Sequence, residues 1–308
     1  MITVLAGGVG AAKFLEGLAA VMPQEEITVI VNTGDDAIFH GLHVSPDIDT
    51  VIYTLAGLAD RERGWGLRDE TYQCLDALGK LGEETWFTIG DRDLATHLYR
   101  TRRLREGALL SEVTAELVQL HNLRLKILPM SDDPAPTLLN TSEGVLSFQE
   151  YFVRLRQQPE VLAVDLSAAA QARPAPGVIE AIERARAVIV APSNPIISIG
   201  PILAVQDVRE ALVDTKARVA AISPIIGGKA MKGPADRMLA SLGHESSATA
   251  VAKIYADFLD AFFLDCQDVL LQAYVERYGM RVVVANTFMS SAIAKENLAR
   301  VVLETLET

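Results

Sequence analysis

The sequence predicts a doubly wound, Rossmann-like α/β fold with a mainly parallel sheet and a largely helical insertion. Two observations support this prediction. A β-rich run over residues 2–6 leads directly into the glycine turn Gly7-Gly8-Val9-Gly10, and apolar side chains then recur at helical spacing over residues 11–22. In the second part of the chain, short apolar runs alternate with helical patterns. This order is typical of a parallel sheet with helices on both faces.

The N-terminal segment is predicted to form the first β-α-β unit of the sheet. Its second strand is an apolar, β-branched run over residues 26–32, which ends in Thr33-Gly34-Asp35-Asp36. The connection between two parallel strands of one sheet is nearly always right-handed, so the intervening helix is expected to cover one face of the sheet. These residues open a nucleotide-binding core that we assign to residues 1–46 and 123–308.

The middle of the chain has mainly helical patterns. Amphipathic stretches lie over residues 69–81 and 111–120, and a short apolar segment over residues 84–89 leads into Gly90-Asp91-Arg92-Asp93. We therefore interpret residues 47–122 as a mainly helical insertion that covers one edge of the sheet and contributes to substrate binding.

The α/β alternation returns after the insertion. Strands are predicted over residues 123–128, 161–165, 187–191, 218–222, 262–265 and 281–285. Helices are predicted over residues 177–185, 235–242, 249–259 and 290–306. Because strand and helix alternate, we expect these strands to join the same parallel sheet.

The composition of the chain limits its partners and its compartment. Half of the 308 residues are hydrophobic, and the net charge of −12 at pH 7 argues against binding to nucleic acid or to an anionic membrane. The two cysteines, Cys74 and Cys266, form no C-x-x-C motif, which favours a reducing compartment. No signal peptide is evident, and the most apolar window, residues 188–205, contains three prolines. We expect a cytoplasmic protein with small-molecule substrates and with no nucleic-acid or membrane partner.

The first candidate binding element is the turn Gly7-Gly8-Val9-Gly10-Ala11-Ala12-Lys13. Glycines let the backbone approach a ligand closely, and the start of the following helix offers unpaired N–H groups to an anion. The spacing of a P-loop is absent, and Lys13 stands where a dinucleotide-binding fingerprint has its third glycine. The turn is interpreted either as an anion-binding element or as a tight connection between strand and helix.

Four aspartates form the second candidate element. Asp35 and Asp36 follow the second strand, and Asp47 and Asp49 follow a dozen residues later. Carboxylates gathered at the carboxyl end of a sheet repel one another unless a cation lies between them, and oxygen ligands of this kind suit Mg²⁺. The alternative is that these are solvated loop acids and helix caps, with Asp47 or Asp49 capping a helix that begins near Thr50.

Three further candidate segments directly follow apolar runs of the sequence. The first contains Thr88 and Asp91, which are candidates for contact with a substrate. The alternative is that a helix starts here, with Asp93 in its first turn and His97 in a structural role. The second contains Ser193 and Asn194 between prolines, and Ser198 beyond them is a candidate helix cap. The third contains the residues Gly227, Gly228, Lys229 and Lys232, which are typical either of a phosphate clamp or of a solvated lysine loop. We expect all five elements to meet at one edge of the sheet.

Taken together, these segments resemble the ordered motif set of the 2-phospho-L-lactate transferase family. The resemblance extends over nearly the whole chain and depends on the set rather than on any one motif. The matching segments are Gly-Gly-x-Gly-x-x-Lys at residues 7–13, Asn32-Thr33-Gly34-Asp35-Asp36, Ser45-Pro46-Asp47-Ile48-Asp49-Thr50, Gly90-Asp91-Arg92-Asp93-Leu94, Pro129-Met130-Ser131-Asp132-Asp133, Pro192-Ser193-Asn194-Pro195 and Gly227-Gly228-Lys229-Ala230-Met231-Lys232-Gly233-Pro234.

The resemblance implies an enzyme of coenzyme F-420 synthesis. In the implied step, a phospholactyl group passes from lactyl-2-diphospho-5′-guanosine to the ribityl hydroxyl of the deazaflavin Fo, and GMP is released. Bacterial members are expected to use the phosphoenolpyruvyl equivalent. The resemblance also implies Mg²⁺ as cofactor and a homodimer. Whether the carrier bears lactate, enolpyruvate or glycerate is left open.

Roles for individual residues follow from the same resemblance. The guanosine diphosphate site would comprise Gly7, Gly8, Gly10, Lys13, Ser193, Asn194, Gly227, Gly228, Lys229 and Lys232. The metal would be held by Asp35, Asp36 and Asp47, and the catalytic carboxylates would be those of Asp36, Asp47 and Asp49. The deazaflavin would contact Asp49, Thr88 and Asp91.

Two other functions compete with this interpretation. A non-catalytic relative of the gluconeogenesis-factor type, which senses nucleotide sugars, shares the glycine turn and the Asn-Thr-Gly-Asp-Asp segment. The Gly90-Asp91-Arg92-Asp93-Leu94 segment and the intact Gly-Gly-Lys loop favour the enzyme. An NAD-dependent oxidoreductase is disfavoured by Lys13, and by a second strand that ends in Asn32 rather than in an acid placed to hold a ribose.

Overall fold

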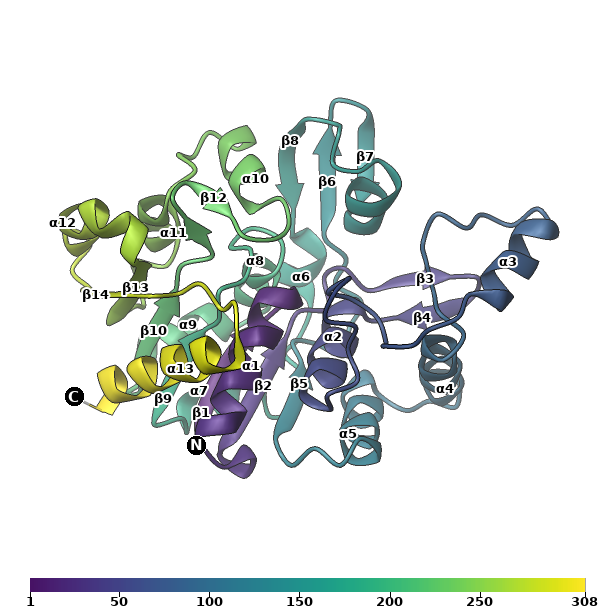
Figure 1. The fold of residues 1–308 in the computed structure, drawn as a ribbon, viewed down its shortest axis with the longest axis horizontal. Helices are drawn as coiled ribbons and strands as arrows, with labels where there is room; N and C mark the ends of the chain where they lie inside the picture. The colour runs from purple at the N-terminus through teal and green to yellow at the C-terminus, as the bar shows by residue number, and fades with distance from the viewer. Residues whose placement is uncertain (308) are drawn as a thin grey trace.

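The central sheet of the protein is entirely parallel (Figure 1). The structure is a computed structural model that describes residues 1–307. Its seven strands lie in the order β14 (Arg281–Ala285), β13 (Ala261–Asp265), β10 (Arg218–Ile222), β9 (Ala187–Val190), β1 (Ile2–Ala6), β2 (Ile27–Val31) and β5 (Lys126–Pro129). The predicted doubly wound α/β fold is confirmed. The chain first winds outward from β1 through β2 to β5 and then returns to β9, so the winding direction reverses between β1 and β9.

Helices cover both faces of this sheet, as the alternation in sequence predicts. Successive strand side chains point to opposite faces, so Val4 packs in one hydrophobic cluster and Leu5 in the other. The first face is covered by α1 (Gly8–Val21), α2 (Pro46–Leu55), α5 (Leu110–Leu120) and α13 (Ala292–Glu307). The second face is covered by α6 (Ser167–Gln171), α7 (Val178–Glu183), α8 (Ile199–Ala204), α9 (Val208–Asp214), α11 (Ala248–Ile254) and α12 (Gln272–Glu276).

Three small antiparallel sheets lie outside the central one. They are the hairpin β3 (Ala37–Phe39) and β4 (Leu42–Val44), the pair β11 (Ile225–Ile226) and β12 (Lys229–Ala230), and the sheet of β7 (Gly144–Ser147), β6 (Leu138–Thr141) and β8 (Val161–Asp165). The expectation that residues 161–165 join the central sheet is wrong, because this strand pairs antiparallel with β6. Two of its five side chains, Leu162 and Ala163, are exposed, whereas a central parallel strand is buried on both faces.

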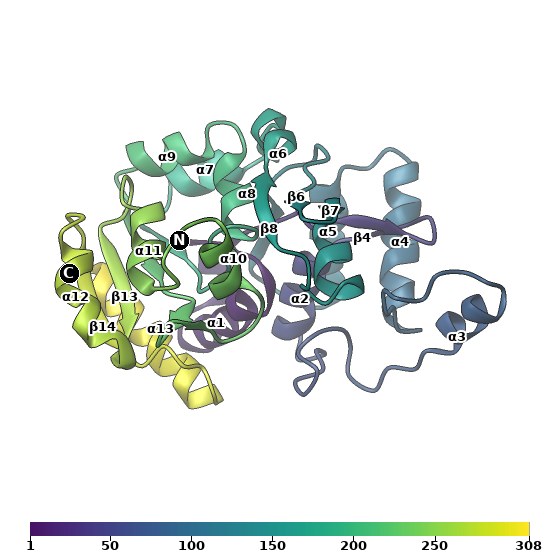
Figure 2. The same ribbon diagram turned by 90° about the horizontal axis from the view of Figure 1, so that it is seen from above.

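Within the helical middle of the chain, α2 and α5 pack on the sheet, whereas the segment between them extends away from it (Figure 2). Figure 2 shows α3 (Gln73–Lys80) far from the central sheet, beyond α4 (Asp93–Arg105). The helix predicted over residues 69–81 begins only at Gln73. The remaining helical turns are η1 (Gln24–Glu26), η2 (Glu150–Arg154), α10 (Ala235–Ser241) and η3 (Cys266–Leu271).

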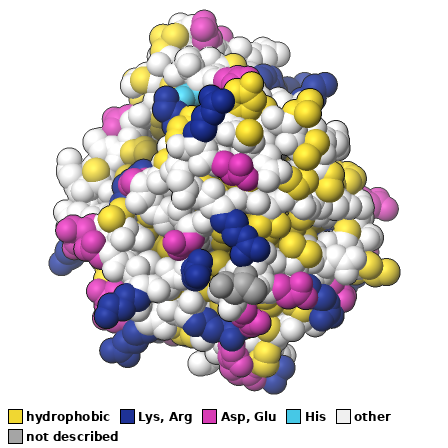
Figure 3. Space-filling view, turned by 90° about the vertical axis from the view of Figure 1, so that its left-hand side faces the viewer, with side chains coloured by type: hydrophobic (Ala, Val, Ile, Leu, Met, Phe, Trp, Pro, Cys, Tyr) yellow, Lys and Arg dark blue, Asp and Glu magenta, His cyan; other side chains and the backbone are white. Residues whose placement is uncertain are grey.

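Lys, Arg, Asp and Glu side chains are interspersed on the face at the β14 edge of the sheet, without a patch of one sign (Figure 3). Within residues 1–307, no helix has both the length and the apolar character that spanning a membrane requires.

Gly17 lies where α1 and α13 cross, and it sets how closely the two helices approach. A Cβ atom at this position would lie 2.8 Å from the Cβ of Lys295 and would overlap the carbonyl group of that residue. Gly17→Ala is therefore expected to reduce the free energy of unfolding by about 1–3 kcal/mol through overpacking, despite the helix propensity that alanine adds. Urea unfolding measures this change. Gly79→Ala on the exposed α3 is the control, because its new methyl would face only the methyl group of Thr85.

Candidate active site

A cavity of about 700 Å³ lies at the carboxyl end of the central sheet. The residues that line it include five that directly follow strands of that sheet or lie in the loops after them: Gly7, Asp35, Ser193, Ser223 and Thr287. Ligands of open α/β sheets bind at this edge, next to the point where the winding direction reverses. The structure therefore places the candidate site where the fold class predicts it.

The cavity brings together most of the candidate residues predicted from the sequence. The candidates that line it are Gly7, Gly8, Gly10, Lys13, Asp35, Asp47, Asp49, Thr88, Ser193, Asn194 and Lys232. The candidates outside its lining are Asp36, Asp91, Gly227, Gly228 and Lys229.

The glycine turn forms the contact between α1 and the loop after β9. The backbone N–H of Gly7 donates a hydrogen bond to the Oγ of Ser193 over 3.2 Å. A Cβ atom on Gly7 would lie 2.6 Å from the Cβ of Ser198, and one on Gly10 would overlap the carbonyl oxygen of Pro192. Both glycines are thus required by close packing, as the interpretation of a tight connection proposes. This packing holds Ser193 and the start of α1 side by side in the wall of the cavity.

Asp35 and Asp47 share one amide group in the floor of the cavity. The Nδ2 of Asn32 donates to the Oδ1 of Asp35 over 3.2 Å and to the Oδ2 of Asp47 over 2.9 Å. The Oδ1 of Asn32 in turn accepts a hydrogen bond from the backbone N–H of Gly34 over 2.9 Å, which fixes the orientation of the amide. The single side chain of Asn32 therefore holds the two carboxylates next to each other.

Burial and mutual repulsion favour protonation of this carboxylate pair. Burial, followed by the charges of Asp47 and Asp36, raises the pKa of Asp35 well above its ordinary value. Burial also raises the pKa of Asp47 to about 7; the hydrogen bond from Asn32 opposes this rise, and the charge of Asp36 adds to it. Neither Asp35 nor Asp47 has an ion-pair partner among residues 1–307. Two adjacent buried carboxylates without a cationic side chain fit the hard oxygen donors that hold Mg²⁺.

Asp36 lies beside this pair but outside the lining of the cavity. Its Oδ2 accepts hydrogen bonds from the Oγ of Ser45 over 2.6 Å and from the Nε2 of His43 over 3.0 Å. Burial raises the pKa of Asp36, although His43 and Ser45 oppose the rise. Its Oδ1 is buried without a hydrogen-bond partner among the described residues. The role of Asp36 as a metal ligand remains a prediction.

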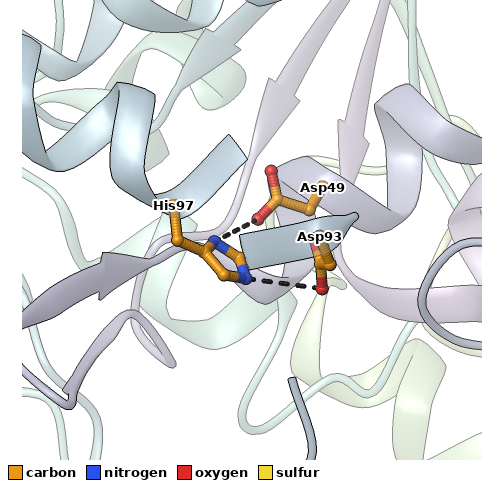
Figure 4. A group of neighbouring side chains, drawn as sticks. All are labelled: Asp49, Asp93 and His97. Carbon is orange, nitrogen blue, oxygen red and sulfur yellow. Dashed lines mark ion pairs between the residues drawn. The ribbon is translucent and has the colours of Figure 1, made fainter. Parts of the chain in front are cut away.

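Asp49 belongs to a buried network with Arg100, His97 and Asp93. Figure 4 shows three of its members, Asp49, His97 and Asp93. Arg100, which is fully buried, binds both carboxylate oxygens of Asp49 and donates to the Nδ1 of His97 over 3.3 Å. The imidazole lies between the two aspartates, with its Nδ1 3.8 Å from Asp49 and its Nε2 3.3 Å from Asp93. The three side chains have the composition of a metal site. We interpret them as a network of polar contacts, because Arg100 already neutralises Asp49 and His97 turns a different nitrogen toward each carboxylate.

Asp91 caps a helix outside the cavity, whereas Asp93 lines the cavity. The carboxylate of Asp91 accepts hydrogen bonds from the Oγ1 of Thr71 over 2.6 Å and from the backbone N–H groups of Gln73 and Cys74 over 2.9 Å. These bonds, that of Thr71 first, lower the pKa of Asp91. Sequence reasoning missed Asp93 and His97 as cavity residues. Their i, i+4 spacing at the start of a predicted helix was the available signal.

Basic side chains line another part of the cavity. Burial, followed by the charges of Lys232 and Lys295, lowers the pKa of Lys13. Lys295 pairs with Glu16 over 2.6 Å, but Lys13 and Lys232 have no ion-pair partner in the described part of the chain. The Nζ of Lys232 lies against Gly64, on the other side of the cavity mouth. These two uncompensated ammonium groups favour an anionic ligand.

Gly227 and Gly228, which precede Lys232 in the same loop, are held by hydrogen bonds within the protein. The backbone N–H of Gly227 donates to both carboxylate oxygens of Asp268, over 3.0 and 3.2 Å. The carbonyl oxygen of Gly228 accepts a hydrogen bond from the Oγ of Ser246 over 2.7 Å. These contacts anchor the loop that carries Lys232 into the cavity wall.

Aromatic side chains form the third part of the cavity lining. They are Tyr53, Trp65, Phe87, Phe148, Phe152 and Phe288. Phe87 stacks on Phe39 of β3, with 3.8 Å between ring centroids. Phe148 and Phe152 also stack, with 5.3 Å between centroids. Flat apolar surfaces of this kind suit a planar ring system. Sequence reasoning missed Phe148 and Phe152, which lie beyond the unpredicted hairpin β6–β7.

The Pro129-Met130-Ser131-Asp132-Asp133 segment has a structural role. Asp132 accepts hydrogen bonds from the backbone N–H and the Oγ of Ser111, over 2.7 and 2.9 Å, at the start of α5. Asp133 accepts a hydrogen bond from the backbone N–H of Arg173 over 3.0 Å. Neither aspartate lines the cavity.

The Asp35–Asp47 pair predicts a dependence of stability on pH and Mg²⁺. The ordinary pKa of Asp47 is 3.8, and burial raises it to about 7 in the folded state. The metal-free folded protein therefore retains a proton that the unfolded chain releases, so its stability should fall as the pH rises between about 4 and about 7. At about 1.4 kcal/mol for each pH unit of this window, the loss approaches about 4 kcal/mol.

Mg²⁺ should reverse this loss because it binds the ionised carboxylates. Urea unfolding at about pH 5 and about pH 8, with and without Mg²⁺, measures the effect. We expect the stabilisation by Mg²⁺ to be larger at the higher pH. Asp47→Asn should weaken the dependence on pH and on Mg²⁺ together; an unchanged dependence on both would contradict the assignment.

A family model described as 2-phospho-L-lactate transferase CofD matches residues 2–305. A 2-phospho-L-lactate transferase from Methanosarcina mazei is 40% identical over 98% of this chain and 99% of the relative. A phosphoenolpyruvate transferase from Streptomyces griseus is 44% identical over 99% of this chain and 98% of the relative. A solved structure from Bacillus halodurans, a member of the UPF0052 family, has the same fold with a TM-score of 0.64, 16% identity and 98% coverage of both chains.

Proposed function

The chain belongs to the 2-phospho-L-lactate transferase CofD family, and we propose that it transfers a phosphorylated three-carbon acid from a guanosine diphosphate carrier to the ribityl hydroxyl of the deazaflavin Fo, releasing GMP. One observation supports this proposal most strongly. The cavity combines a buried carboxylate pair, Asp35 and Asp47, with the uncompensated lysines Lys13 and Lys232 and an aromatic wall. A metal–diphosphate group and a planar acceptor would each find a matching surface there.

The basic part of the cavity is the proposed site of the carrier. The diphosphate would lie between Lys13, Lys232 and the Asp35–Asp47 pair, so that its negative charge meets the two ammonium groups. The Ser193 and Asn194 loop, held against the start of α1, would contact the nucleoside. Charge compensation and alignment supply most of the catalysis in transfers of this kind.

Asp35 and Asp47 are the proposed holders of Mg²⁺. A bound Mg²⁺ neutralises charge on the diphosphate and makes GMP a better leaving group. Asn32 keeps the two carboxylates together, and the backbone of Gly8 donates to Asp47. The ligands are therefore placed before the metal binds, which reduces the cost of ordering the site.

The aromatic part of the cavity is the proposed site of the deazaflavin. Its ring system would stack among Phe87, Phe148 and Phe152, near Thr88, and its ribityl chain would extend toward the carboxylates. The attacking hydroxyl and the distal phosphorus would then meet in the middle of the cavity. Holding both reactants in this way removes much of the entropic cost of a reaction between two molecules.

Product analysis tests the proposal. The protein is incubated with Mg²⁺, Fo and the lactate, enolpyruvate and glycerate forms of the carrier in competition, and products are identified by mass spectrometry. We expect GMP and a phosphodiester of Fo in equal amounts, and the mass of the diester identifies the transferred acid. The relatives are named for both lactate and enolpyruvate transfer. No GMP with any carrier, in the presence of Mg²⁺ and Fo, would overturn the proposed function.

A further inference from the structure

We propose that Asp93 accepts the proton of the attacking hydroxyl and that His97 is its positioning residue. The inference rests on the proposed function, because it assigns the proton of the same reaction. It adds a catalytic residue that neither the family resemblance nor the predicted aspartate set contains.

The other candidate carboxylates either bind side chains of the protein or are the proposed metal ligands. Both oxygens of Asp49 are bound by Arg100, and Asp36 turns toward Ser45 and His43. Asp35 and Asp47 share the amide of Asn32 and are the proposed metal ligands. A carboxylate held by a guanidinium or by a metal is a poor acceptor, because its lone pairs are occupied.

Asp93 faces the cavity with its carboxylate fixed in place. It is the first residue of α4, and its side chain is 16% exposed. The hydroxyl of Tyr53 donates to its Oδ1 over 2.7 Å, and the Nε2 of His97 lies 3.3 Å from its Oδ2. The backbone N–H of Asp93 donates to Glu70 over 3.1 Å. Each carboxylate oxygen accepts about two hydrogen bonds, so room remains for a substrate hydroxyl.

His97 links Asp93 to the buried charge network shown in Figure 4. Arg100 donates to the Nδ1 of His97, so this nitrogen carries the lone pair and the Nε2 carries the proton that faces Asp93. The imidazole is only 1% exposed and cannot rotate freely between its two neighbours. The contacts from Asp49 through Arg100 therefore hold the imidazole of His97 beside the Asp93 carboxylate, with its Nε2 3.3 Å from the Oδ2.

The environment of Asp93 keeps its carboxylate ionised. Burial acts to raise the pKa of Asp93, but the nearby His97, followed by the hydrogen bond of Tyr53, lowers it overall. An ionised carboxylate can accept the proton late in the reaction, when the attacking oxygen is already bonding to phosphorus. In protein kinases, a weakly basic aspartate accepts the proton of the substrate hydroxyl in the same way.

The step balances in atoms and charge. The ribityl oxygen forms a bond to the distal phosphorus, and the bond from that phosphorus to the bridging oxygen breaks with its electron pair, so that GMP leaves. The hydroxyl proton moves to Asp93, which later releases it to solvent through the open side of the cavity. No oxidant, reductant or further reactant is needed.

Chemical rescue tests the assignment. Asp93→Asn should lower kcat by about 10²–10⁴-fold, the usual effect of removing a general base, while the affinities for GDP with Mg²⁺ and for Fo stay unchanged. Asp93→Ala should lose activity in the same way and regain part of it with added formate, because formate can occupy the space and accept the proton. Asp165→Asn is the matched control, because Asp165 caps α6 outside the cavity.

His97 is tested by the same assays. His97→Gln should lower kcat by about 10–100-fold, the typical effect of removing a supporting contact, with unchanged KM for both substrates. A substitution that only weakened packing would lower stability without this separation of kcat from KM.

Two results would overturn the assignment. One is a wild-type rate in Asp93→Asn. The other is a loss of activity in Asp93→Ala that formate does not restore and that parallels a loss of affinity for Fo. Absence of GMP release by the wild-type protein would overturn the proposed function and this assignment together.

Discussion

Asp47→Asn is expected to lower turnover by at least about 100-fold, the scale of losing a major electrostatic contact to the transition state, while the metal-free protein becomes more stable. The two effects have one cause. The carboxylate of Asp47 is buried next to Asp35, and its charge is useful only when a cation compensates it. The isosteric amide removes the repulsion and weakens the Mg²⁺ site.

Turnover and unfolding measured on the same preparation provide the test. GMP release gives the turnover, and urea unfolding without metal gives the stability at about pH 8, above the raised pKa. Asp133→Asn is the control, because Asp133 also lies in a loop after a strand of the central sheet but outside the cavity. Wild-type turnover in Asp47→Asn would contradict the proposed metal site. Lost turnover with a lower stability would show that the carboxylate is needed for folding instead.

Asn32→Asp is expected to reduce the free energy of unfolding by about 3–5 kcal/mol, the usual cost of an uncompensated buried charge. Asn32 is 1% exposed, and its amide is the donor that Asp35 and Asp47 share. An aspartate at this position removes the donor and adds a third carboxylate of the same size. The loss should grow with pH, because the added charge forms only when the new side chain is ionised.

The matched control is Asn286→Asp. Asn286 is exposed, and its Oδ1 accepts the backbone N–H of Phe288, a contact that an aspartate retains. Denaturant unfolding of both variants should separate the buried position from the exposed one by several kcal/mol. Mg²⁺ should partly restore Asn32→Asp, because a cation compensates the added carboxylate. Equal stability of the two variants would show that the environment of Asn32 is more polar than its burial indicates.

The central sheet could be predicted from local patterns because its strands are continuous apolar runs. Residues 187–191 and 218–222 are examples, since both faces of these strands are covered by helices. Residues 161–165 have a similar pattern but join another sheet, because strand partners are chosen by contacts far along the chain. The hairpin β3–β4 was missed because its strands have only three residues each.

The meeting of Asp35 and Asp47 was predictable, because both lie at the carboxyl edge of the same sheet. The sequence did not predict whether Asp91 or Asp93 faces the cavity. The hydrogen-bond donors to Asp91 come from the start of α3, about 20 positions earlier in the chain. The contacts of Arg100 and His97 with Asp49 were also beyond sequence reasoning. Their partner Asp49 lies about 50 positions away, and no local periodicity reports that contact.

The contact of Lys232 with Gly64 has a kinetic consequence. It joins two loops from opposite sides of the cavity mouth, one from the region after β10 and one from the region after α2. An incoming diphosphate would draw the ammonium group of Lys232 away from Gly64, so we expect the rate at which the carrier enters to depend on how easily this contact opens.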